Sequence, residues 1–189
     1  MKYRESDMPS NDQWETFFDL QFVLERIGVD KSVNIFIDIG CGYGTFLFPA
    51  AKIVKNKVIG IDIDPEMIKH CKEYSEKHGF TNVELILGDI DTIQIDNIKS
   101  KGIIDYIALF NMLHCEEPIK LLKYSYDLLE MNGSVGVIHW KYEKTPRGPS
   151  MQIRPKPEQI IKWGDEAGFK VKNTVELPPY HFGIVFIKS

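Results

Sequence analysis

The sequence has only three cysteines, little arginine and no long hydrophobic run. Cys41, Cys71 and Cys115 form no CxxC pair, which argues against a disulfide framework or a zinc knuckle and is typical of a reducing compartment. No apolar stretch is long enough to span a bilayer, and the opening segment MKYRESDMPS contains no apolar signal-peptide region. We therefore expect a cytoplasmic protein with no membrane partner and no metal site.

A strong charge of one sign is also missing. The net charge of −4 provides no general attraction to a phosphate backbone, so nucleic acid is not an expected partner. With 189 residues, 43% of them apolar and 26% charged, the composition is ordinary for one globular domain. We expect a single domain over residues 1–189, and nothing in the sequence indicates an oligomeric state.

Strand-like and helix-like segments alternate along the chain. Short apolar runs of the kind buried on both faces of a sheet predict strands at residues 33–38, 58–61, 83–87, 103–110 and 134–140. Helical spacing of apolar residues predicts helices over residues 65–79 and 117–131, the first ending at Gly79. This order is typical of βαβ units, and hence of an α/β fold with a parallel sheet and helices on both faces.

The two ends of the chain depart from this alternation. Residues 169–175 and 181–187 read as two successive strands joined by ELPPY, and such a tight connection is usually antiparallel. Near the N-terminus, Ser10 and Gln13 form a capping-box pattern ahead of an apolar stripe. We expect residues 1–30 to form an N-terminal helical cap.

A glycine-rich stretch, DIGCGYGTF, follows the first predicted strand. In a doubly wound sheet this loop lies at the carboxyl edge, where such folds bind ligands. Gly40, Gly42 and Gly44 allow a tight turn and let a ligand approach the backbone. A glycine loop by itself is a weak signal, because a plain strand-to-helix turn has the same composition.

Acidic residues strengthen the signal. Asp62 ends the second predicted strand, about twenty residues after the loop, where an acid accepts both hydroxyls of a ribose. Two features argue against a nicotinamide cofactor: Thr45 stands where the third glycine of that fingerprint belongs, and Asp38 would repel a pyrophosphate. A carboxylate in that place suits a cationic ligand.

The motifs DIGCGYG, IDIDPEM, LGDI and IALFNMLHCEEP, in this order, resemble the class I S-adenosylmethionine-dependent methyltransferases. The resemblance covers most of residues 33–189. It implies a Rossmann-like fold, doubly wound, with seven mostly parallel strands and an antiparallel last strand. It also implies the cofactor S-adenosyl-L-methionine, with S-adenosyl-L-homocysteine as product.

The resemblance assigns cofactor contacts position by position. Asp38 and the loop around Gly40, Cys41, Gly42 and Gly44 match the segment that holds the amino-acid end of the cofactor. The matches farther along the chain are Asp62 at the ribose, Ile63, Asp89 and Ile90 at the adenine, and Phe110 and Asn111 at the methionine ammonium. Each acid taken singly is equally consistent with a solvated residue at a strand end.

The methyl acceptor is expected to contact three segments, because family pockets form from the N-terminal helix, the loop after the fourth strand and the segment after the fifth. These correspond to residues 3–22, 111–118 and 139–157, and the proline-rich part is residues 141–157. Candidate substrate contacts are Trp14, Phe18, Tyr142, Arg147, Arg154 and His181. The two arginines suit a carboxylate or phosphate on the acceptor, although ion pairs with acids of the protein or with the cofactor carboxylate are an equal alternative.

Two histidines are candidate catalytic bases. His114 follows the fourth predicted strand and His139 lies near the end of the fifth, at the same edge of the sheet. The alternative for both is a histidine that only lines the cleft.

The sequence thus predicts methyl transfer to a small molecule. Two other interpretations stay open: a protein or RNA methyltransferase of the same fold, and a domain that binds the cofactor without catalysis. The acidic balance and the absence of an N-P-P-Y-type or D-P-P-Y-type motif after the fourth strand argue against RNA.

Overall fold

A seven-stranded sheet organises the computed structural model, which describes residues 19–189. The strands are β1 (Ile35–Ile39), β2 (Lys57–Asp62), β3 (Val83–Leu87), β4 (Tyr106–Phe110), β5 (Ser134–Trp140), β6 (Lys170–Leu177) and β7 (His181–Ile187). Their order is β3-β2-β1-β4-β5-β7-β6. Strands β1 to β5 pair in parallel, and β7 pairs antiparallel with both β5 and β6. The predicted fold class, including the antiparallel C-terminal pair, is confirmed.

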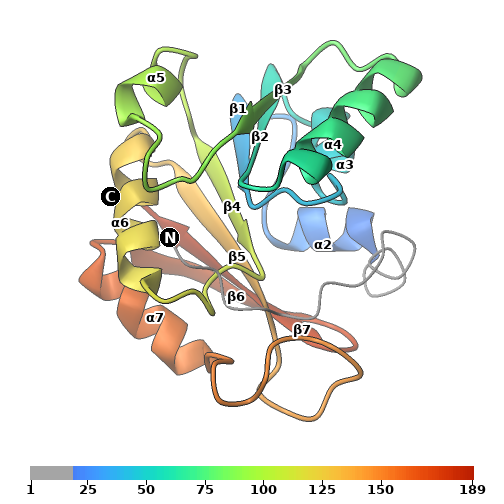
Figure 1. The fold of residues 1–189 in the computed structure, drawn as a ribbon. Helices are drawn as coiled ribbons and strands as arrows, with labels where there is room; N and C mark the ends of the chain where they lie inside the picture. Colours follow the sequence, from blue (N-terminus) through green and yellow to red (C-terminus); the bar gives the residue numbers. More distant parts are fainter. Residues whose placement is uncertain (1–18) are drawn as a thin grey trace.

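Helices cover both faces of the sheet (Figure 1). They are α2 (Leu20–Arg26), α3 (Leu47–Ala51), α4 (Pro65–His78), α5 (Ile95–Lys99), α6 (Pro118–Leu128) and α7 (Pro157–Glu166). Apolar side chains of α2, α3 and α4 belong to one buried cluster, and those of α5, α6 and α7 belong to a second. Within residues 19–189, no helix is both long enough and apolar enough to cross a bilayer.

The central strands are buried along their whole length. Every residue of β1, β4 and β5 is buried, which explains why these segments read as unbroken apolar runs rather than as alternating patterns. In the edge strand β6, buried and exposed residues alternate only at the end, where Val175 and Leu177 are buried. The order of the strands places the carboxyl ends of β1, β2 and β4 side by side.

Several predicted boundaries needed correction. Helix α6 ends at Leu128, because Leu129 takes an extended conformation, so the predicted end at residue 131 is wrong. Strand β4 begins at Tyr106 rather than at residue 103. Helix α4 has the predicted C-cap, since Gly79 takes the left-handed conformation with φ +71°. The sequence analysis missed α3, α5 and α7.

The N-terminal helix is described only in part. Asp19 is the N-cap of α2, and its side chain accepts a hydrogen bond of 3.0 Å from the backbone N–H of Phe22. The described helix therefore begins at Leu20. The predicted cap at Ser10 and Gln13 lies outside the described residues.

A buried tyrosine links β4 to the end of α2. The Tyr106 ring stacks on Phe36, and its hydroxyl donates a hydrogen bond of 2.8 Å to the carbonyl of Ile27. Replacing Tyr106 by Phe keeps the ring but leaves this carbonyl without a partner. We expect Tyr106→Phe to lower the free energy of unfolding by about 1–2 kcal/mol in urea titrations.

A matched control is Tyr124→Phe, which removes a hydroxyl bonded at 3.0 Å to the carbonyl of Ile93 in a partly buried place. Water can replace the Tyr124 hydroxyl as partner of the Ile93 carbonyl. The loss in free energy of unfolding should therefore be below about 0.5 kcal/mol. Equal losses for the two variants would show that burial of the Ile27 carbonyl is not what makes the Tyr106 bond matter.

Candidate active site

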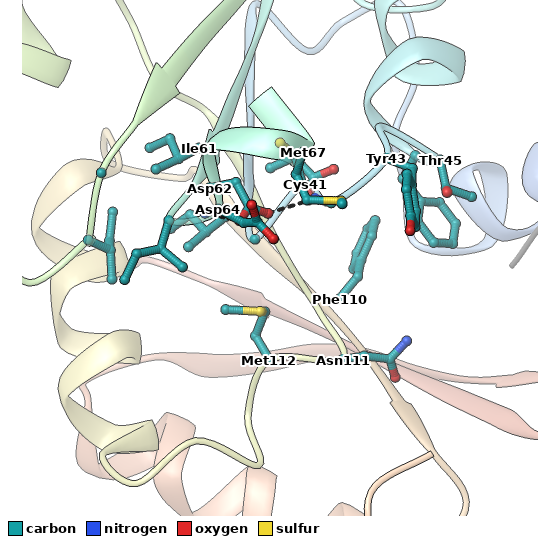
Figure 2. Close-up of a pocket in the computed structure, with 18 residues that line it drawn as sticks. Cys41, Tyr43, Thr45, Ile61, Asp62, Asp64, Met67, Phe110, Asn111 and Met112 are labelled. Atoms are coloured by element: carbon teal, nitrogen blue, oxygen red, sulfur yellow. Dashed lines mark hydrogen bonds between the residues drawn. The ribbon is translucent and has the colours of Figure 1, made fainter. Parts of the chain in front are cut away.

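A pocket opens at the carboxyl ends of β1, β2 and β4 (Figure 2). Its walls come from the glycine loop after β1, the end of β2, the start of α4, and the residues that follow β3 and β4. Nine of the predicted cofactor residues line it: Asp38, Gly40, Cys41, Gly42, Asp62, Ile63, Ile90, Phe110 and Asn111. The structure therefore brings together segments from four separate motifs.

The glycine loop is packed tightly against its surroundings. Gly40 has φ +77°, and a Cβ there would lie 2.4 Å from the sulfur of Met112. Gly44 has φ +79°, and a Cβ there would lie 2.4 Å from the ring of Phe48. Gly44 does not line the pocket, so its requirement for glycine comes from packing and backbone conformation rather than from a ligand contact.

Asp62 is held in place by the loop that it faces. Its Oδ2 accepts a hydrogen bond of 2.8 Å from the backbone N–H of Gly42, drawn as a dashed line in Figure 2. Its Oδ1 accepts one of 2.9 Å from the N–H of Asp64. Each carboxylate oxygen can accept a second hydrogen bond, so the side chain is oriented and still able to bind hydroxyl groups.

Asp38 is a buried carboxyl group in the same pocket. Only 3% of its surface is exposed. Burial, and second the nearby negative charge of Asp62, raise the pKa of Asp38 to about 7. Two acids at adjacent strand ends therefore create a site that is stabilised by a cation.

Asp89 takes a different position from its neighbours. It lies after β3, and its Oδ1 accepts a hydrogen bond of 3.0 Å from the N–H of Asp91. Gly88 and Ile90, on either side of it, line the pocket, whereas Asp89 does not. A contact between Asp89 and an adenine stays a prediction.

Sequence reasoning missed several lining residues. Tyr43 and Thr45 stand inside the glycine loop, Met67 lies in the first turn of α4, and Met112 follows β4. All four lie inside sequence stretches that the motif analysis quotes, and that position was the available signal. Tyr43 contacts His70 of α4 edge to face, with ring centroids 5.4 Å apart.

The proline-rich loop of residues 141–157 is organised by Arg154. Its guanidinium group is buried, and all three of its nitrogens donate hydrogen bonds, at 2.8–3.4 Å, to the backbone carbonyls of Lys141, Glu143, Arg147 and Pro149 and to the hydroxyl of Thr145. The expectation that Arg154 binds an anionic acceptor is thus corrected, because its donors are used within its own loop.

The other residues predicted to contact the methyl acceptor differ in burial and in their neighbours. His181 is completely buried, its ring centroid is 4.1 Å from that of Trp140, and it does not line the pocket, so its predicted substrate contact is also corrected. Tyr142 is 43% exposed, with the amine of Lys156 4.7 Å from its ring centroid. Arg147 is half-buried, and Trp14 and Phe18 fall outside the described part of the chain.

The two candidate bases are neighbours. The rings of His114 and His139 meet edge to face, with centroids 5.6 Å apart. His139 is completely buried, and this burial, followed by the proximity of His114, holds the pKa of His139 well below its usual range. His139 is therefore a neutral imidazole at physiological pH. Among residues 19–189 no cluster of His, Cys, Asp or Glu is suited to a metal ion.

Residues 30–146 match the methyltransferase domain family. The chain belongs to this family. A structure of a S-adenosylmethionine-dependent methyltransferase from Aquifex aeolicus superposes with a TM-score of 0.81 at 26% identity, over 95% of this chain and 94% of that one. The resemblance to class I S-adenosylmethionine-dependent methyltransferases, found from the motifs, is confirmed.

Two kinds of relative are similar in sequence. Aklanonic acid methyltransferase of Streptomyces is 27% identical over 143 residues, which are 69% of this chain and 62% of that protein. Ribosomal protein L11 methyltransferase of Vibrio vulnificus is 42% identical over 86 residues, which are 46% of this chain and 27% of that protein. The chain thus spans less than two thirds of the length of these relatives.

The residues that line the pocket fit S-adenosylmethionine. That cofactor carries an ammonium, a carboxylate, a sulfonium and a ribose diol. The buried carboxyl of Asp38 matches the need for a cation, and Asp62 keeps acceptor capacity for a diol. The apolar side chains of Ile63, Met67 and Ile90 provide a surface for a flat base at the Asp62 side.

The first prediction for this site concerns pH. Below about pH 7 Asp38 holds a proton and loses its attraction for the ligand ammonium. We expect the affinity for S-adenosylhomocysteine to rise with pH, by about tenfold per unit well below pH 7, and then to level off. Calorimetry between pH 5.5 and pH 7.5 measures this change.

Asp38→Asn is the control, because it keeps the size of the side chain and cannot ionise. Its affinity should be low and nearly constant over the same pH range. A wild-type affinity that does not vary with pH would show that Asp38 does not face the ammonium.

A second prediction concerns the loop of residues 141–157. Lysine keeps the charge of Arg154 but cannot form the same fork of donors. We expect the loop of the Arg154→Lys variant to open more often than that of the wild type. Tryptic cleavage after Lys144 and Arg147, measured by mass spectrometry, should then be about tenfold faster. Arg147→Lys is the matched control and should be cleaved at the wild-type rate; equal rates for both variants would contradict the proposed role of Arg154.

Proposed function

We propose that the protein transfers the methyl group of S-adenosylmethionine to a small-molecule acceptor. The observation that carries this proposal is the pocket in which Asp38 and Asp62 meet the glycine loop, with Asn111 at its other end. This arrangement supports binding of a cationic nucleoside ligand with its reactive part toward the residues that follow β4.

The small-molecule acceptor is the finer part of the proposal. The similarity to aklanonic acid methyltransferase extends over 69% of the chain. The similarity to L11 methyltransferases covers smaller parts, 29% and 46% in two Vibrio examples.

Each part of the pocket has a proposed task. Asp62 binds the ribose hydroxyls, Ile63 and Ile90 enclose the adenine, and Asp38 attracts the ammonium end. When bound, S-adenosylmethionine supplies an activated methyl group on a sulfonium, which is an excellent leaving group. The protein therefore has mainly to hold the acceptor close and in line with that group.

His114 and His139 are proposed to serve the acceptor side. Since His139 is neutral and completely buried, it can accept a hydrogen bond from its neighbour His114. Its lowered pKa makes it a poor final holder of a proton, so His114 is the better candidate for a base.

A transfer assay with methyl-labelled S-adenosylmethionine and an extract of the source cells tests the function. The extract is divided into small molecules, proteins and nucleic acids. Label in the small-molecule fraction supports the proposal, and label in protein or RNA overturns the acceptor class. Asp62→Ala should abolish the transfer and the binding of cofactor together.

The proposed base gives a further prediction. We expect His114→Ala to lower kcat for the labelled acceptor by about a hundredfold and to leave the affinity for S-adenosylhomocysteine unchanged. His78→Ala, at the exposed end of α4, is the control and should behave as wild type. An unaltered kcat in His114→Ala would show that His114 is not the base and only packs against its neighbours.

A further inference from the structure

Most backbone N–H groups of the glycine loop are already bonded within the protein. Gly40 and Cys41 both donate to one carbonyl at the end of β2, at 2.8 and 3.1 Å. Gly42 donates to Asp62 at 2.8 Å, and Gly44 donates to the carbonyl of Cys41 at 2.8 Å. Each N–H has a single hydrogen, and glycine-rich loops bind anions through N–H groups that are free. These four groups are therefore not available to the carboxylate of a ligand.

The carboxyl group of Asp38 is in the opposite situation. It lines the pocket, only 3% of the residue's surface is exposed, and no hydrogen bond from the described residues reaches it. A buried carboxylate without a partner is costly, and a positive charge brought by a ligand removes that cost. Asp38 thus calls for a cation.

The other charged side chains of the pocket have the same sign as Asp38. Among the described lining residues they are Asp62 at the end of β2 and Asp64 at the N-cap of α4. The hydroxyl groups of Tyr43 and Thr45 can donate hydrogen bonds but are neutral, and they lie on the side of the pocket away from Asp62 (Figure 2). The described walls therefore favour a cation over an anion.

These walls act differently on the two charged groups at the amino-acid end of S-adenosylmethionine. The ammonium is attracted by Asp38, whereas the carboxylate one carbon away is repelled by the same acid and by Asp62. Charges interact more strongly in a partly buried pocket than in water, so this repulsion is not fully screened. The carboxylate of the ligand consequently lowers the affinity that the ammonium provides.

We propose that the pocket takes a second class of ligand, adenosyl thioethers and sulfoniums that keep the amine and lack the carboxylate, and binds them more tightly than the corresponding amino acids. This inference rests on the proposed function and extends it to the part of the cofactor that is recognised. A ligand of this class keeps its adenine, its ribose and the attraction of its amine to Asp38. It lacks only the group that the acids repel.

Calorimetry with two unreactive ligands tests the inference and needs no methyl acceptor. One ligand is S-adenosylhomocysteine, and the other is S-adenosyl-3-thiopropylamine, its decarboxylated form, which has a hydrogen in place of the carboxylate. The measurement is made at about pH 8, where Asp38 is ionised. We expect the wild type to bind the decarboxylated ligand about tenfold more tightly.

Asp38→Asn shows whether this acid causes the preference. Asparagine has nearly the same size and no charge, so it neither attracts the amine nor repels the carboxylate. Both ligands should bind more weakly, and the preference should fall to about twofold or less. Glu66→Gln is the matched control, because it removes an exposed charge from the first turn of α4 that does not line the pocket. It should keep the wild-type preference.

The inference and the proposed function fail in different ways. A wild type that binds S-adenosylhomocysteine as tightly as the decarboxylated ligand, or more tightly, would overturn the inference and keep the proposed function. A tenfold preference that persists in Asp38→Asn would overturn the role given to Asp38. A wild type that binds neither ligand would reject the proposed function itself.

Discussion

The candidate site depends on the negative charge of two carboxyl groups that line one pocket. Asp38 and Asp62 end neighbouring parallel strands, and both line the same pocket. The backbone N–H groups of Gly42 and Asp64 stabilise Asp62, while Asp38 is buried and has its pKa raised to about 7. The pocket is thus most stable with a cation in it, which is the property a sulfonium and ammonium ligand requires.

The glycine loop stabilises one of these two carboxyl groups. Gly42 donates its N–H to Asp62, and Gly40 is close enough to Met112 that no side chain fits. The turn that stabilises Asp62 is therefore itself fixed by close packing.

The loop of residues 141–157 is held by a different kind of interaction. The donors of Arg154 are used on carbonyls and on one hydroxyl of that loop, so the loop is closed on itself. Next to it, His139 is kept neutral by burial, and the oxygen of Asn111 is left without a partner among the described residues.

The strands, the helices α4 and α6, the parallel sheet with its antiparallel end, and the presence of Asp38, Asp62 and the glycine loop at one edge could be predicted from the sequence. These features depend on local pattern: apolar runs for β1 and β4, and a polar motif directly after each strand, which topology brings to one edge. The tertiary structure was needed to find the hydrogen-bond partners of Arg154, the packing around Gly44 and the left-handed backbone of Asn111. An arginine in a proline-rich loop reads the same whether it binds a substrate or its own carbonyls, because the hydrogen-bond partners are set by how the loop folds back on itself.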